Sequence, residues 1–138
     1  MEKLPSGLPD EIVDDEDLAR FLTSKSQYST LIVKPSAFRP NPKGQETSVS
    51  RHGREPSVRL WKIGAEAAGD RTLHGAAIFK ARDVRTSKLE VFADEPPPRH
   101  ASILKWPWIE NDPEEEKAQQ MERAIELASA AGTPYLVK

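Results

Sequence analysis

The sequence contains no cysteine, and this absence excludes several classes of protein. Without thiols the chain can form no disulfide, no cysteine-ligated zinc or iron–sulfur site and no thiol nucleophile. Long hydrophobic runs are also missing, because the most apolar stretch, residues 30–33, is far shorter than the ~20 residues that a membrane helix needs. The N-terminal residues lack the apolar core of a secretory signal. We therefore expect a cytoplasmic protein that does not associate with membranes.

Motifs that bind phosphate, metal or cofactors are absent as well. The glycine patterns GxxxxGK[ST] and GxGxxG do not occur, and neither do GxSxG or HExxH. The chain has three histidines that could ligate a metal, His52, His74 and His100, and Asp94 or Glu95 could add an oxygen ligand. No two of these histidines are close enough in sequence to share a helical turn or a short strand. We expect no metal and no cofactor.

The composition is typical of one small globular domain. The chain has 138 residues, of which 37% are hydrophobic and 30% charged, and it has 12 prolines against 7 glycines. So many prolines favour short elements and long connections. We expect a flexible, loosely docked tail over residues 1–10 and a single domain over residues 11–138. The predicted class is α+β, with a small mixed or antiparallel sheet, a C-terminal helix and one or two shorter helices.

The pattern of apolar and turn-forming residues predicts the individual elements. Strands are expected over residues 28–33, 46–52, 71–79, 89–93 and 100–106, and helices over residues 14–22, 56–68, 81–85 and 113–131. In the helix over residues 56–68 we expect Val58, Trp61 and Ala65 to form the apolar face, although Gly64 weakens this prediction.

The last helix has the clearest signals in the chain. Asp112 is a typical N-cap, Pro113 suits the first helical position and Gly132 favours the end of the helix. Its apolar face is expected to consist of Ala118, Met121, Ile125 and Ala128, widened by Ala124 and Leu127.

The net charge of −2 conceals three differently charged segments. Residues 1–33 contain three basic and seven acidic residues, residues 34–88 contain twelve and five, and residues 89–138 contain five and ten. The basic middle is either an anion-binding surface or is neutralised internally by the acidic ends. A chain of this net charge is not expected to bind DNA nonspecifically, and a phosphate-containing ligand remains a candidate.

Histidines beside arginines suggest one catalytic hypothesis. His52 and His100 would act as general base and acid on a nucleotide or RNA phosphate, with Arg51 and Arg99 stabilising the charge that develops. Such a metal-independent enzyme requires both imidazoles to face one pocket.

A second hypothesis is a noncatalytic module that binds a protein partner. Trp106 and Trp108 flank a proline, and proline-flanked indoles suit a rigid binding surface. Arg54 and Arg59 of the basic middle segment would extend it. The alternative is that Trp106 closes the core while Trp108 packs on the last helix. Because no strong catalytic pattern is present, the sequence favours this binding or accessory module over the enzyme.

Residues 89–100 include the run DEPPPRH, which is followed by Trp106-Pro107 and by Lys117-Ala118-Gln119. This pattern resembles uncharacterised small bacterial proteins over the last third to half of the chain. The resemblance implies a bacterial cytoplasmic protein, such as a component of a multi-component system, and assigns no activity.

Overall fold

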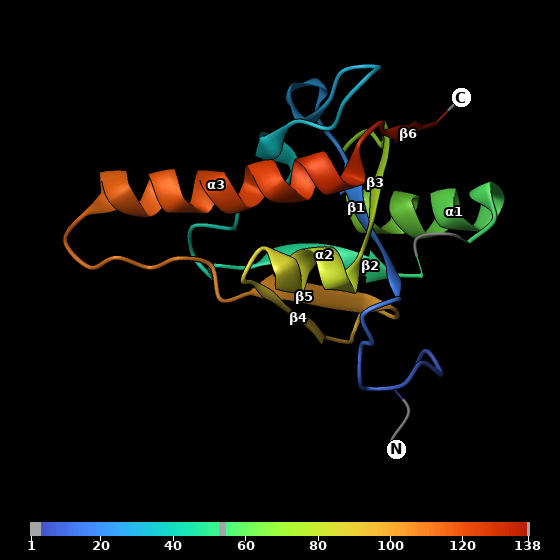
Figure 1. Ribbon diagram of the computed structural model, residues 1–138. Coiled ribbons are helices and arrows are strands. Elements are labelled where there is room, and N and C mark those ends of the chain that lie inside the picture. Colours follow the sequence, from blue (N-terminus) through green and yellow to red (C-terminus); the bar gives the residue numbers. More distant parts are fainter. Residues whose placement is uncertain (1–3, 53–54, 138) are drawn as a thin grey trace.

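Six strands form one sheet in the computed structural model, which describes residues 4–52 and 55–137 (Figure 1). Their order across the sheet is β4-β5-β2-β1-β3-β6, and every neighbouring pair is antiparallel. β4 and β6 therefore form the two edges. The strands are β1 (Asp17–Leu22), β2 (Thr47–Arg51), β3 (Gly75–Lys80), β4 (Glu90–Ala93), β5 (His100–Leu104) and β6 (Tyr135–Leu136).

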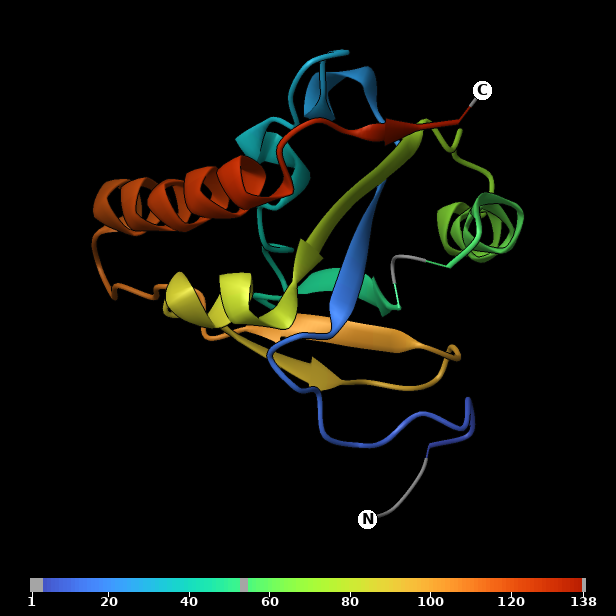
Figure 2. The same ribbon diagram turned by 45° about the vertical axis from the view of Figure 1, so that its right-hand side comes forward.

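Helices cover both faces of the sheet. α2 (Ala81–Thr86) and the long α3 (Pro113–Ala131) lie over one face, whereas α1 (Ser57–Ala68) lies over the other (Figure 2). Two short 3₁₀ helices, Lys25–Gln27 and Pro35–Ala37, precede β2, and the second packs against α3. The α+β prediction is confirmed: the sheet is antiparallel, and a C-terminal helix accompanies two shorter ones.

The main core lies between the sheet and α3. Leu18 and Ile103 of the sheet are fully buried there together with Leu127 of α3. Phe38 and Phe79 meet edge to face, with ring centroids 5.3 Å apart, a geometry that aromatic pairs favour. Burial of this apolar surface provides most of the free energy that holds α3 on the sheet.

A smaller core lies under α1. Leu60 packs against Phe21 and Ala76, and Gly64 allows the helix to approach closely, because a Cβ at this position would lie 2.7 Å from the Phe21 ring. The predicted helix is confirmed, but its predicted face is only partly correct, because Trp61 packs against this core whereas Val58 does not. The buried residues of α1 are Leu60, Gly64 and Ala68, which lie on a different side of the helix from Val58. Val58 is therefore 84% exposed.

Two predicted elements are wrong. Residues 14–22 contain a strand rather than a helix: Leu18 and Leu22 face the α3 side, whereas Phe21 faces α1. A central strand with two buried faces has a nearly continuous apolar sequence that also fits helical spacing. Residues 28–33 form a loop with one isolated bridge, and its Leu31 is 75% exposed.

α3 begins and ends as predicted. The Asp112 carboxylate accepts a hydrogen bond from Glu115 N–H at 3.1 Å, and Gly132 ends the helix with a φ of 66°. Its buried residues are Ala124, Leu127 and Ala128. Ile125 is 51% exposed, so the predicted apolar face is only partly correct.

The N-terminal segment is tied to the sheet by side-chain hydrogen bonds. Within the expected tail, Ser6 donates from N–H and Oγ to the Glu95 carboxylate, at 3.0 and 2.5 Å. The strongest attachment is Arg51, whose side chain is fully buried. Its guanidinium forms two hydrogen bonds with the Glu16 carboxylate, at 2.5 and 2.8 Å, and a third with Pro9 O at 2.6 Å. Arg51 thereby joins β2 to the chain that leads into β1.

We predict that Arg51→Met destabilises the fold by about 3–5 kcal/mol, because it leaves the Glu16 carboxylate buried without a partner. Urea denaturation measures this change in the free energy of unfolding. The matched control is Arg59→Met, since the Arg59 side chain is 61% exposed and its loss is expected to cost less than ~0.5 kcal/mol. Equal midpoints for the two variants would contradict the assignment.

Candidate functional site

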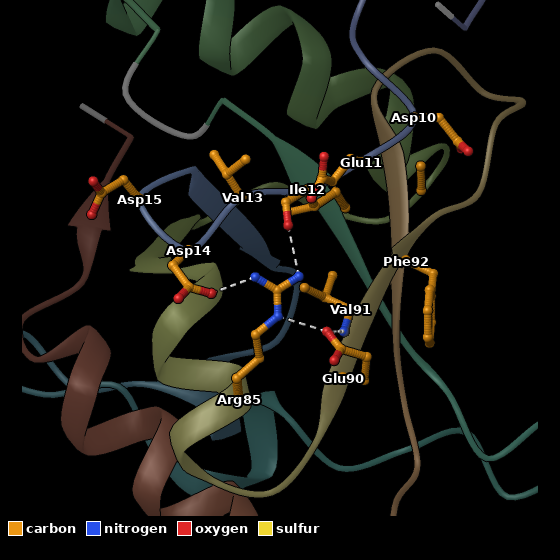
Figure 3. Close-up of a pocket in the computed structure, with 11 residues that line it drawn as sticks. Asp10, Glu11, Ile12, Val13, Asp14, Asp15, Arg85, Glu90, Val91 and Phe92 are labelled. Carbon is orange, nitrogen blue, oxygen red and sulfur yellow. Dashed lines mark hydrogen bonds and ion pairs between the residues drawn. The ribbon is translucent and has the colours of Figure 1, made fainter. Parts of the chain in front are cut away.

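A groove runs between the edge strand β4 and the segment of residues 10–15 (Figure 3). Its volume is about 780 Å³, and we call it the β4 groove. One wall is formed by residues 10–15, the other by residues 90–93, and Arg85 of α2 lies between them. The site therefore combines an edge of the sheet with a loop that lies beside it.

Arg85 holds the two walls at a fixed distance. Its guanidinium donates to Asp14 Oδ1 at 2.5 Å, to Ile12 O at 2.7 Å and to Glu90 Oε1 at 2.7 Å. Figure 3 shows these bonds spreading from Arg85 toward the loop on one side and toward β4 on the other. The buried Ile12 side chain anchors the loop to the main core. Arg85 and Ile12 thus fix the positions of both groove walls.

The ion pair changes the acidity of both partners. The hydrogen bond to Glu90 is the largest cause that raises the pKa of Arg85, and the bond to Asp14 adds to it. Burial by itself would raise the pKa of Glu90, but the hydrogen bonds from Arg85 and from Val91 N–H outweigh burial and lower it. Both groups therefore stay charged near neutral pH.

The backbone of β4 directs hydrogen-bonding groups into the groove. Asp94 N–H donates to His100 O at 2.9 Å, which identifies this pair as hydrogen-bonded in the β4–β5 ladder. Hydrogen-bonded and non-hydrogen-bonded pairs alternate in an antiparallel ladder, so Val91 and Ala93 direct N–H and C=O away from β5. Within residues 4–52 and 55–137, no strand pairs with this outer edge.

The side chains at the groove are acidic and partly apolar. Asp10 and Glu11 make no ion pair with any described residue, whereas the exposed Asp15 pairs with Arg82 at 3.1 Å. Phe92 is 46% exposed and Val13 54% exposed. The side chains of Phe92 and Val91 project from opposite faces of β4, and that of Val91 points toward Arg85 (Figure 3). The groove thus presents negative charge beside exposed apolar groups.

The four residues predicted to be catalytic do not form one site. His52 lines a cavity of about 390 Å³ with Glu16 and Glu55, whereas His100 lines a different cavity. Arg51 is engaged with Glu16, and Arg99 donates to Glu55 Oε1 at 2.6 Å. The Arg99 hydrogen bond lowers the pKa of Glu55 despite the opposing effect of burial. The requirement that both imidazoles face one pocket is not met.

The predicted partner surface is also divided. Trp106 is only 5% exposed, and its Nε1–H donates to Ile103 O at 3.2 Å, so it belongs to the core. Trp108 is 68% exposed in the loop before α3, whereas Arg59 lies on α1 at the opposite side of the molecule (Figure 1). Arg54 lies outside the described residues. The two indoles therefore do not form one exposed surface.

In the described part of the chain, no group of three or more histidine, aspartate or glutamate side chains is placed to hold a metal ion. No helix there is both long and apolar enough to cross a membrane.

The sequence predicted the strand at residues 89–93 but not its place at the edge of the sheet beside the groove. Which strand lies at an edge depends on the order of strands, and no local pattern encodes it. One signal was available, because Phe92 stands between the buried Val91 and the half-buried Ala93. An exposed aromatic residue on the polar side of a short strand is a candidate contact for a ligand or a partner protein.

Comparison of the chain with protein-family models, with curated proteins and with solved structures gives no significant match. The resemblance to small bacterial proteins stays a prediction.

We predict that Arg85→Met raises the pKa of Glu90 toward its ordinary value of 4.5. The fold is then expected to lose roughly 1–2 kcal/mol at neutral pH, a value reduced for partial exposure of the pair. In the unaltered protein this stabilisation is complete above the ordinary pKa and is lost as the pH falls through the lower folded-state pKa. Carboxyl NMR titration measures the shift. Arg82→Met is the control, and a Glu90 pKa that is the same in all three proteins would contradict the ion pair.

Proposed function

We propose that the protein is a noncatalytic binding module that recognises an extended, basic segment of a protein partner in the β4 groove. The observation that carries this proposal is the outer edge of β4, which lines the β4 groove and pairs with no strand among the described residues. A partner segment would add to the sheet as a seventh strand. The proposed setting is the cytoplasm of a bacterium, within a multi-component system, and it rests on the cysteine-free sequence and on the resemblance in residues 89–119.

The backbone supports an extended ligand. The outward N–H and C=O groups of Val91 and Ala93 match the two-residue spacing of a neighbouring strand. Val91 N–H donates to Glu90 Oε1 at 3.0 Å. A carbonyl group of the partner would take the place of this carboxylate oxygen at Val91 N–H, and Glu90 would keep its hydrogen bond with Arg85. Exposed strand edges pair readily with other chains, and here the loop of residues 10–15 restricts access to a narrow extended segment.

The side chains support a basic ligand with apolar residues at alternate positions. Lysine or arginine side chains of the partner would meet Asp10 and Glu11, which have no positive partner among the described residues. Apolar side chains would cover Phe92 and Val13. Charge complementarity of this kind speeds encounter and excludes acidic partners.

Selection from a random peptide library tests the proposal. Selected peptides are expected to alternate basic and apolar residues, and the largest amide shifts in NMR spectra of the complex are expected at Val91 and Ala93. Ala93→Pro should weaken binding at least tenfold, about 1.4 kcal/mol, because it removes an outward N–H that the β4–β5 ladder does not use.

Additional variants separate binding from folding. Phe92→Ala and the double substitution Asp10→Lys with Glu11→Lys change only exposed side chains and should also weaken binding at least tenfold. Trp108→Ala removes an exposed aromatic residue elsewhere and should leave binding unchanged. Selection of acidic peptides, or loss of binding only in Trp108→Ala, would overturn the proposal.

A further inference from the structure

A second cavity, of about 530 Å³, lies beside the C-terminal end of α1. Three arginines line it: Arg20 of β1, Arg39 of the loop between the second 3₁₀ helix and β2, and Arg71 after α1. His100 of β5 adds an imidazole. We call it the arginine cavity. These residues come from four separate parts of the chain, so only the fold brings them together.

The three arginines differ from all other arginines that the structure describes. Each of the others forms an ion pair with a carboxylate: Arg51 with Glu16, Arg59 with Glu55, Arg82 with Asp15, Arg85 with Asp14 and Glu90, Arg99 with Glu55, and Arg123 with Glu126. Within the same residues, Arg20, Arg39 and Arg71 form none. The arginines without a carboxylate partner thus all line one cavity.

Arg20 is held in place by neutral groups only. β1 and β2 are paired at Ala19 and Ser50 and separate beyond this point. Arg20 bridges the gap, and its Nε and NH1 donate to Ala37 O and Ser48 O at 2.8 and 2.9 Å. Carbonyl oxygens fix the position of a guanidinium without neutralising its charge.

Arg71 is oriented in a similar way. Its Nε and NH2 donate to Ala68 O and Ala67 O at 3.1 and 3.2 Å, at the C-terminal end of α1. Burial, and then the charge of Arg71, lower the pKa of Arg20 to about 10. The two cations therefore repel each other across the cavity. An anion bound between them would offset this electrostatic repulsion.

The remaining lining fits an anion that carries an organic group. Glu46 is the only acidic residue among the lining residues, and its carboxylate is turned onto Gly44, where a Cβ would lie 2.4 Å from Oε1. Ser48 and Ser50 provide hydroxyl groups. Apolar surface comes from the Phe21 ring and from three prolines, Pro40, Pro42 and Pro97.

We infer that the arginine cavity binds a small molecule bearing a phosphate or pyrophosphate group, with Arg20 and Arg71 holding the phosphate oxygens and Arg39 closing over them. Planar guanidinium groups match phosphate oxygens through paired hydrogen bonds. The number of unpaired cations favours a multiply charged phosphate over a single carboxylate. The cavity shares no lining residue with the β4 groove, so this site is independent of the peptide site.

Calorimetric titration with inorganic pyrophosphate and with adenosine monophosphate tests the inference. Both ligands are expected to saturate one site at millimolar concentration or below, whereas succinate, a carboxylate dianion, should bind at least tenfold more weakly. NMR signals of the Arg20 and Arg71 Nε–H groups should shift on addition of the ligand. Absence of saturation by both phosphates, or equal affinity for succinate, would overturn it.

Substitutions locate the site. Arg71→Gln should weaken phosphate binding at least tenfold, and Arg39→Gln should weaken it by a smaller factor. Arg59→Gln removes the same charge from α1 outside the cavity and is expected to have no effect. Because Arg20 also connects two strands, Arg20→Lys is the safer change there, and it should weaken binding while thermal unfolding confirms the fold. Equal losses in Arg59→Gln and Arg71→Gln would show nonspecific charge attraction and would refute the site.

Discussion

The buried ion pair between Arg51 and Glu16 is the interaction on which the rest of the structure depends. Glu16 lies just before β1, at the centre of the sheet, and Arg51 ends β2 beside it. The same guanidinium also binds Pro9 O and, at a longer 3.4 Å, Glu11 O, so one side chain fixes the whole approach to β1. Residues 10–15 form a wall of the β4 groove, and the groove therefore exists because a buried arginine organises the chain that leads into it.

The basic residues of the middle segment fall into two groups, those paired with carboxylates and those that line the arginine cavity. Arg82 and Arg85 pair with Asp15 and Asp14 of the acidic N-terminal segment, and Lys80 lies 3.5 Å from Asp17. This is the internal neutralisation that the charge pattern suggested as one alternative. The other alternative, an anion-binding surface, corresponds to the ligand that we infer for the arginine cavity. The charge pattern of the sequence is compatible with both possibilities. Only the ion pairs in the structure distinguish the arginines that have a carboxylate partner from the described arginines that have none.

The parts of the fold that sequence reasoning predicted are those set by local chemistry. α3 was predicted because Asp112, Pro113 and Gly132 act on backbone groups within one turn of the helix. β1 was missed because a strand buried on both faces loses the alternation that distinguishes strands from helices. The candidate sites were missed for a related reason: β4 becomes an edge, and Arg20 meets Arg71, only through contacts between distant residues. His52 and His100 were paired because each follows an arginine in the sequence, and they line separate cavities.

Because Gly64 has no side chain, it affects more than the packing of α1. Phe21 touches the helix at Gly64 and also lines the arginine cavity, and the same helix ends at the carbonyl groups that orient Arg71. A larger residue at this position would push α1 outward and carry Arg71 away from Arg20. The absence of a side chain at Gly64 thus sets the distance between two positive charges, and through it the size of the anion that the inferred site would accept, although Gly64 does not line the cavity.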